Sequence, residues 1–199
     1  MQEISYKPDT LRALHAPRIA WKTIIAAVMA TALVAICAHI AMPLGFTPIP
    51  VTMQTFAVLL LGLLFSPGAA FACLALYLIE GALGLPVFSP HGPGGIAQLL
   101  GPSGGYLLSY PLAAALASLL YRRGRRRFVA AFAAAGLASI LILAAGATWF
   151  GILSHVRFSV IFAQSIAPFL FGDAVKVVAA AACVTLLASF SELSRDRTL

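Results

Sequence analysis

Six long apolar runs dominate this 199-residue chain and restrict what it can fold into. Hydrophobic residues make up 61% of the sequence and charged residues only 10%, which is too apolar for a soluble domain of this length. We therefore predict an all-α integral membrane protein with six transmembrane helices. The predicted helices cover residues 22–42, 51–65, 68–85, 104–121, 128–153 and 168–190. They form one membrane domain, 22–190, between a cytoplasmic N-terminal segment, 1–21, and a cytoplasmic tail, 191–199.

Basic residues fix the expected orientation of these helices. If the N-terminus lies inside and the chain crosses six times, every Lys and Arg except Arg157 and Lys176 falls on the inner side. The run Arg122–Arg127 then forms an inner loop, in agreement with the positive-inside rule. The net charge of +7 is therefore explained by topology, and we expect no nucleic-acid partner.

The outer connections differ from ordinary short loops. Residues 45–52 follow Pro43 and contain two more prolines, which predicts a rigid, non-helical segment. Residues 85–105 hold four prolines and six glycines, and a loop of this length is typical of a lid or a binding wall. Residues 154–164 mix polar and aromatic side chains, which suggests an interfacial or re-entrant piece.

Two charges lie within the last apolar run, Asp173 and Lys176. Their spacing puts both on one helix face, and a charge at the bilayer centre costs roughly 2.5–3.5 kcal/mol on insertion scales. We interpret them as the polar floor of an outward-opening pocket, although a pair that only pins the helix would have the same spacing. Pro168 and Gly172 precede the pair and predict an interruption of the helix there. Glu80, near the outer end of the third helix, is expected in the same outer half of the membrane.

Polar residues at two other helix starts are candidates for the same pocket. Gln54 and Thr52, with Thr55, offer amide and hydroxyl groups at the start of the second helix, where they would serve equally well as an N-terminal cap. Tyr106 begins the fourth helix after two glycines, and it either lines the pocket or joins an interfacial aromatic belt.

Other features limit the function classes and suggest a contact surface. The cysteines and histidines lack metal-ligand spacing, and no P-loop motif occurs. We therefore expect no metal, no cofactor and no ATP hydrolysis by this chain. The first helix carries small residues at close spacing, which permit tight helix contact inside the protein or with a partner subunit. The candidates for a partner interface are Ala26, Ala30, Thr31 and Ala35.

Four motifs, in order along the chain, resemble those of the BioY family of biotin-specific substrate-binding (S) components of energy-coupling factor (ECF) transporters. The motifs are PVTMQT (50–55), GALGLPVF (81–88), GPSGGYL (101–107) and PFLFGDAVK (168–176). The resemblance covers about Lys22 to Ser189. It departs from the family pattern at Ser103, Ser109 and Phe171, and none of these changes removes a charged group.

The resemblance implies a biotin-uptake protein rather than an enzyme. It implies that Asp173 accepts hydrogen bonds from the ureido N–H groups of biotin, that Lys176 donates to its polar atoms, and that the loop after Phe88 covers the ligand. It also implies a transmembrane coupling subunit, two ABC-type ATPase subunits and a place in the bacterial inner membrane. The predicted substrate-binding residues are Thr52, Gln54, Phe88, Ser89, His91, Gln98, Tyr106, Asp173 and Lys176. A proton-coupled or facilitated carrier that works alone is the alternative, with Glu80 and Asp173 as proton relays. A membrane enzyme is a third possibility that lacks an assembled nucleophile or metal set.

Overall fold

The computed structural model describes residues 21–124 and 127–196, with side chains described as far as Phe190. Its long helices are α1 (Trp21–His39), α2 (Gln54–Leu64), α3 (Pro67–Ala82), α5 (Gly104–Arg123), α6 (Phe128–Ser154) and α8 (Ala167–Asp196). Two short helices, α4 (Gly95–Leu100) and α7 (Phe158–Ile161), and a π-helical segment η2 (Phe162–Ile166) complete the helical part. The predicted helical membrane class is confirmed. Among the described residues, α1, α5, α6 and the helical run 158–190 are long and apolar enough to cross a bilayer, while α2 and α3 are shorter apolar helices.

Helix α5 is the centre of the bundle. It packs against α6, α3 and α2, and α8 packs against α6 and α2. Many of the residues buried on the faces that meet here are alanines, such as Ala114 and Ala135, which are fully buried. Small side chains let helix backbones approach closely in lipid. The other faces carry large exposed apolar side chains, such as Phe171 at 83% exposure, and these suit contact with acyl chains rather than water.

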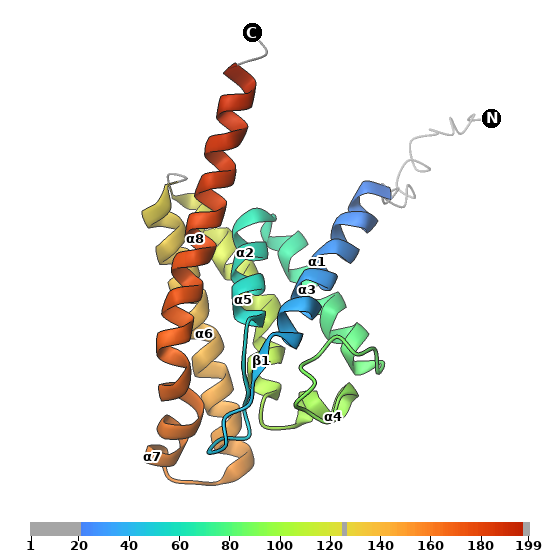
Figure 1. Cartoon of the computed structure of the whole chain (residues 1–199), viewed down its shortest axis with the longest axis vertical. Coiled ribbons are helices and arrows are strands. Elements are labelled where there is room, and N and C mark those ends of the chain that lie inside the picture. Colours follow the sequence, from blue (N-terminus) through green and yellow to red (C-terminus); the bar gives the residue numbers. More distant parts are fainter. Residues whose placement is uncertain (1–20, 125–126, 197–199) are drawn as a thin grey trace, which may run out of the picture.

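The ends of the described chain gather at one end of the bundle. Figure 1 shows the start of α1, the α5–α6 connection and the end of α8 at the top, with α4, α7 and the turn after β1 at the bottom. The described basic residues Lys22, Arg122, Arg123 and Arg127 therefore share an end, as the positive-inside argument requires, whereas Arg157 precedes α7 at the other. Residues 1–20, 125–126 and 197–199 lie outside the described part of the chain. They include all but one residue of the predicted N-terminal segment, 1–21, and the end of the predicted tail, 191–199.

The connection from α1 to α2 corrects two predicted boundaries. The first helix ends at His39 rather than Met42, and the second begins at Gln54 rather than Val51. Between them, β1 (Ala41–Met42) and β2 (Val51–Thr52) pair antiparallel, with Ala41 opposite Thr52 and Met42 opposite Val51. The proline-rich residues 43–50 form the turn of this ribbon, so that the segment predicted to be rigid is a short β-hairpin.

The last helix contradicts the predicted interruption at Pro168 and Gly172. Residues 158–196 are helical throughout, and the only irregularity is the π-helical stretch Phe162–Ile166, which comes before Pro168. Pro168 lies in the first turn of α8 after this stretch, where a missing N–H is tolerated. The segment 154–164 is likewise not a separate re-entrant piece. His155 ends α6 in the left-handed conformation, and the next helical turns begin at Phe158.

Close packing of α5 against α6 depends on Gly105. A Cβ atom at this position would lie 2.2 Å from Cβ of Trp149 and 2.7 Å from the carbonyl oxygen of Ala145. We predict that Gly105→Ala lowers the free energy of unfolding by about 1–3 kcal/mol, the usual cost of overpacking. Thermal unfolding in detergent measures the effect. Gly136→Ala in α6 is the matched control, because nothing lies within 4 Å of its added Cβ, and equal melting temperatures for the two variants would contradict this account.

Candidate functional site

A cavity lies between the β-hairpin, the start of α2, the 88–103 loop, α5, α6 and α8. It is in the half of the bundle that carries the hairpin and α4, away from the chain ends (Figure 1). Its polar lining residues are Thr52, Gln54, Thr55, Ser89, Gln98, Ser103, Tyr106, Tyr110, Asp173 and Lys176. Its apolar lining residues are Ile49, Pro50, Leu107, Ile142, Leu143 and Phe169.

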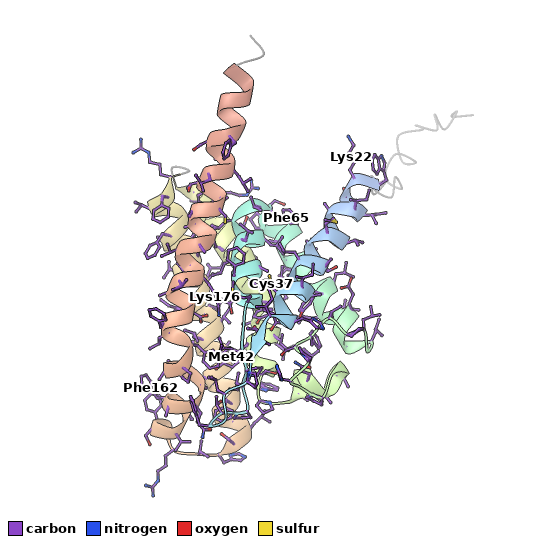
Figure 2. All side chains as sticks on the ribbon, viewed as in Figure 1. Lys22, Cys37, Met42, Phe65, Phe162 and Lys176 are labelled. Carbon is purple, nitrogen blue, oxygen red and sulfur yellow. The ribbon has the colours of Figure 1, made fainter. Side chains whose placement is uncertain are left out.

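Asp173 and Lys176 form an ion pair in the wall of this cavity. Nζ of Lys176 donates to Oδ1 of Asp173 at 2.9 Å, and each residue is only 5% exposed. Figure 2 shows Lys176 midway along the bundle, between Lys22 at one end and Phe162 at the other. The side chains therefore face the protein interior rather than lipid, because helix α8 turns its exposed residues, such as Phe171, the other way.

The ion pair leaves most of its hydrogen-bonding capacity free. An ammonium has three donors and a carboxylate has about four acceptor positions, yet the bond between the two groups is the only one either makes among the described residues. A buried charge with unused donors or acceptors is costly unless a further polar group meets it. The pair is thus suited to a ligand that offers both N–H donors and an oxygen acceptor.

A hydrogen-bonded chain joins α2, α3 and the loop over the cavity. Nε2 of Gln54 donates to the Tyr77 hydroxyl at 2.7 Å, and this hydroxyl donates to the carbonyl of Val87 at 2.8 Å. Thr52 donates to Oε1 of Gln54 at 3.1 Å and also accepts from the backbone N–H of Gln54 at 3.3 Å. Thr52 and Gln54 both line the cavity. Thr52 also satisfies the first N–H of α2, although the N-cap position is Met53, which makes no side-chain cap bond. Tyr77, which is fully buried, was not among the predicted site residues, because no motif or spacing in the sequence distinguishes it.

Gln98 organises the loop on the other side of the cavity. Its Oε1 accepts from the N–H of Gly94 at 3.2 Å, and its Nε2 donates to the carbonyl of Ser89 at 3.4 Å. Gly92 permits this arrangement, since a Cβ there would lie 2.6 Å from Cδ of Gln98. The hydroxyl of Ser89 is buried with no hydrogen-bond partner among the described residues. It lines the cavity, so that it is a polar atom available to a ligand.

The predicted site residues divide into two groups. Seven of them line the one cavity: Thr52, Gln54, Ser89, Gln98, Tyr106, Asp173 and Lys176. Phe88 and His91 do not. Phe88 is buried behind the cavity wall, edge-on to Tyr77 with ring centroids 5.4 Å apart, and His91 is exposed.

Several lining residues were not predicted. Phe169 lies one helical turn before Asp173, and Tyr110 lies one turn after Tyr106, so that the 3.6-residue period places both on the site-facing sides of their helices. Tyr106 and Phe169 are in contact, with ring centroids 5.8 Å apart. The helical period was a signal that could have identified these aromatic walls.

Glu80 does not join the other two charges. It accepts a hydrogen bond from Thr31 at 3.3 Å, and it is not among the residues that line the cavity. The small residues of α1 are also divided: Ala30 and Thr31 are buried within the chain, whereas Ala26 is exposed and Ala35 is half-buried. In this conformation Ala30 and Thr31 are not available to a partner subunit, because the chain's own helices cover them.

Comparison with known proteins agrees with the fold and the motifs. A family model described as the BioY family matches residues 10–192. The chain belongs to the BioY family. A probable biotin transporter BioY of Pyrococcus horikoshii is 37% identical over 149 residues, which cover 75% of this chain and 85% of the relative. The biotin transporter BioY of Thermotoga maritima is 34% identical over 162 residues, which cover 80% and 92% of the two chains.

A solved structure shares the BioY fold of this chain. It is the S-component for biotin from an ECF-type ABC transporter, determined at 2.1 Å, with a TM-score of 0.77 and 22% sequence identity. The match covers 93% of this chain and 95% of the other. These relatives are transport proteins rather than enzymes, and the likeness assigns this chain to the multi-pass membrane proteins.

Removing the Tyr77 hydroxyl tests whether its hydrogen bonds hold the 85–105 loop over the cavity. We predict that Tyr77→Phe destabilises the 85–105 loop by about 1–2 kcal/mol, because the carbonyl of Val87 and the amide of Gln54 each lose a buried partner. Hydrogen exchange of the loop amides in detergent measures the change. Tyr121→Phe is the control, since the Tyr121 ring is buried and its hydroxyl has no hydrogen bond among the described residues. Unchanged exchange in Tyr77→Phe would show that the hydroxyl does not hold the loop.

Proposed function

We propose that this protein is the biotin-binding membrane subunit of an uptake system that separate coupling and ATPase subunits energise. Membership of the BioY family and the names of the relatives support biotin as the ligand. The sequence has no P-loop motif, so any ATP-driven uptake would need another subunit to bind and hydrolyse the nucleotide.

The buried Asp173–Lys176 pair is the observation that carries this proposal. The ureido group of biotin presents two N–H donors and one carbonyl acceptor. A carboxylate accepts from such donors and an ammonium donates to such an acceptor, and charge-assisted bonds of this kind are strong in a dry site. The free hydroxyl of Ser89 supplies one more polar contact on the opposite wall.

The rest of the cavity suits the apolar part of biotin. Phe169, Tyr106, Ile142 and Leu143 offer aromatic and aliphatic surface beside the ion pair, and binding sites for small molecules are usually lined in this way. The valeryl carboxylate is expected near the mouth, where water shares its charge. Thr52, Gln54 and Gln98 shape the cavity walls and present polar groups at its edge.

The membrane placement follows from the helices and the basic residues. We propose six crossings, with the short helices α2 and α3 among them, both termini in the cytoplasm and the cavity facing outward in the inner membrane of a bacterium. Clustering of Lys22, Arg122, Arg123 and Arg127 at the end opposite the cavity supports this orientation. Ala26 and Ala35 of α1 remain the candidates for contact with the coupling subunit.

The stand-alone carrier receives less support from the geometry. A proton relay between Glu80 and Asp173 would need the two carboxylates in one hydrated path, but Glu80 is bonded to Thr31 outside the cavity. Uptake of labelled biotin separates the two functions. An S component should require the coupling and ATPase subunits and tolerate an uncoupler, whereas a proton-driven carrier should work without those subunits and fail with the uncoupler.

Removing the charge of Asp173 tests the site. We predict that Asp173→Asn weakens biotin binding by about 2 kcal/mol or more, because a buried charged acceptor is lost, and this corresponds to roughly a 30-fold higher Kd. Titration calorimetry on detergent-purified protein gives the Kd. Glu80→Gln is the control: it removes an acid of α3 that does not line the cavity, and it should bind like the natural protein. Natural affinity in a folded Asp173→Asn variant would refute the assigned role.

Removing the charge of Lys176, the other member of the ion pair, gives a second test. Lys176→Met should weaken biotin binding and leave membrane insertion intact, because the donor to the ligand is lost and the apolar stem is kept. Binding and the yield of inserted protein are measured side by side. If the variant is merely less stable and binds biotin as before, the pair serves only to pin α8.

A further inference from the structure

Pro168 directly follows the π-helical segment η2 and Ala167, the first residue of α8. Pro168 has no N–H, so the carbonyl four residues earlier, that of Gln164, has no α-helical donor. The hydroxyl of Thr47 fills this position, donating to the Gln164 carbonyl at 2.8 Å. The two residues are 117 positions apart in sequence, so the bond joins the β-hairpin turn to the last helix.

The same hydroxyl also holds the cavity wall on the hairpin side. Oγ1 of Thr47 accepts from the backbone N–H of Ile49 at 3.2 Å, and Ile49 and Pro50 both line the cavity. Thr47 itself is 9% exposed and is not a lining residue. The Thr47 hydroxyl thus donates to η2 and accepts from the hairpin, while the residue itself does not line the cavity.

A second side chain holds the π-helical segment from the other direction. The Tyr106 hydroxyl of α5 donates to the carbonyl of Ser165, and Ser165 is fully buried. Phe169 and Asp173, one and two turns further along, face the cavity. The start of α8 is therefore fixed between the hairpin and α5 immediately before the turns that contribute to the site.

We propose that Thr47 is a positioning residue for the ligand cavity, joining the 43–50 turn to η2, directly before α8, through the Gln164 carbonyl to which Pro168 offers no N–H. Without this bond the hairpin wall formed by Ile49 and Pro50 separates from the wall formed by Phe169. The proposal rests on the proposed biotin-binding function for its affinity readout. It does not depend on that function for the structural contact itself.

Biotin affinity in five variants of the full chain tests the proposal. Thr47→Val removes the hydroxyl at nearly constant volume and should raise the Kd roughly 5- to 10-fold, since a typical buried hydrogen bond is lost. Thr47→Ser keeps the hydroxyl and should restore most of the affinity. Thr148→Val is the control, because Thr148 is exposed and its hydroxyl bonds, among the described residues, only the Ala144 carbonyl of its own helix. Pro168→Ala supplies an N–H that can bond the Gln164 carbonyl, so adding Thr47→Val to it should raise the Kd by less than in the natural background.

Each outcome bears on the proposal. A Thr47→Val protein with a lower melting temperature but natural biotin affinity would overturn it, as would equal losses in Thr47→Ser and Thr47→Val. If Thr47→Val fails to fold, the double variant with Pro168→Ala decides. A folded double variant that no longer binds biotin would contradict the role assigned to the Gln164 carbonyl.

Hydrogen exchange of the ligand-free protein separates this proposal from the function. Thr47→Val should speed exchange of amides in residues 43–50 and 158–170, and Thr148→Val should not. If the natural protein fails to bind biotin but Thr47→Val still speeds exchange, the proposed function is wrong. The contact by which Thr47 links the hairpin to the last helix would then still be supported. Unchanged amide exchange in Thr47→Val would show that Thr47 does not hold the hairpin against the last helix, whatever the ligand is.

Discussion

An ion pair kept out of water is the constraint on which the rest of this structure depends. Asp173 and Lys176 are each 5% exposed in a chain with few other charges inside its helices. Such a pair is tolerated when the two groups meet each other and further polar atoms. The surrounding elements bury the pair but, among the described residues, leave its remaining donors and acceptors unused: α8 turns both groups inward, α5 and α6 approach closely through small residues, and the hairpin and the 85–105 loop cover the site.

The polar side chains in and around the pair have two different roles. Hydrogen bonds to the backbone and to each other engage Gln54, Tyr77 and Gln98, so that these residues fix the cavity walls. Asp173, Lys176 and Ser89 retain unused donors or acceptors toward the cavity. This division explains why a site can be rigid and still have polar groups ready for a guest molecule, which reduces the ordering that binding would otherwise require.

Much of this arrangement could be predicted from the sequence. Apolar runs and the positions of arginine and lysine indicated the helices and the common end of the basic residues, because both depend on local composition. The i,i+3 spacing placed Asp173 and Lys176 on one face. The β-hairpin and the Tyr77 network could not be read in this way, since they depend on contacts between residues far apart in sequence. The predicted break at Pro168 was wrong for a related reason: Thr47, more than a hundred residues earlier, satisfies the carbonyl that the proline leaves free.

The central claim is that the desolvated acid–base pair exists to hold a ligand rather than to stabilise α8. Native mass spectrometry of the detergent-purified protein, incubated with biotin, tests it most directly. The account predicts a bound species heavier by one biotin for the natural protein and its loss in the Asp173→Asn, Lys176→Met double variant, which keeps its fold. A biotin adduct of equal abundance on both proteins would contradict it.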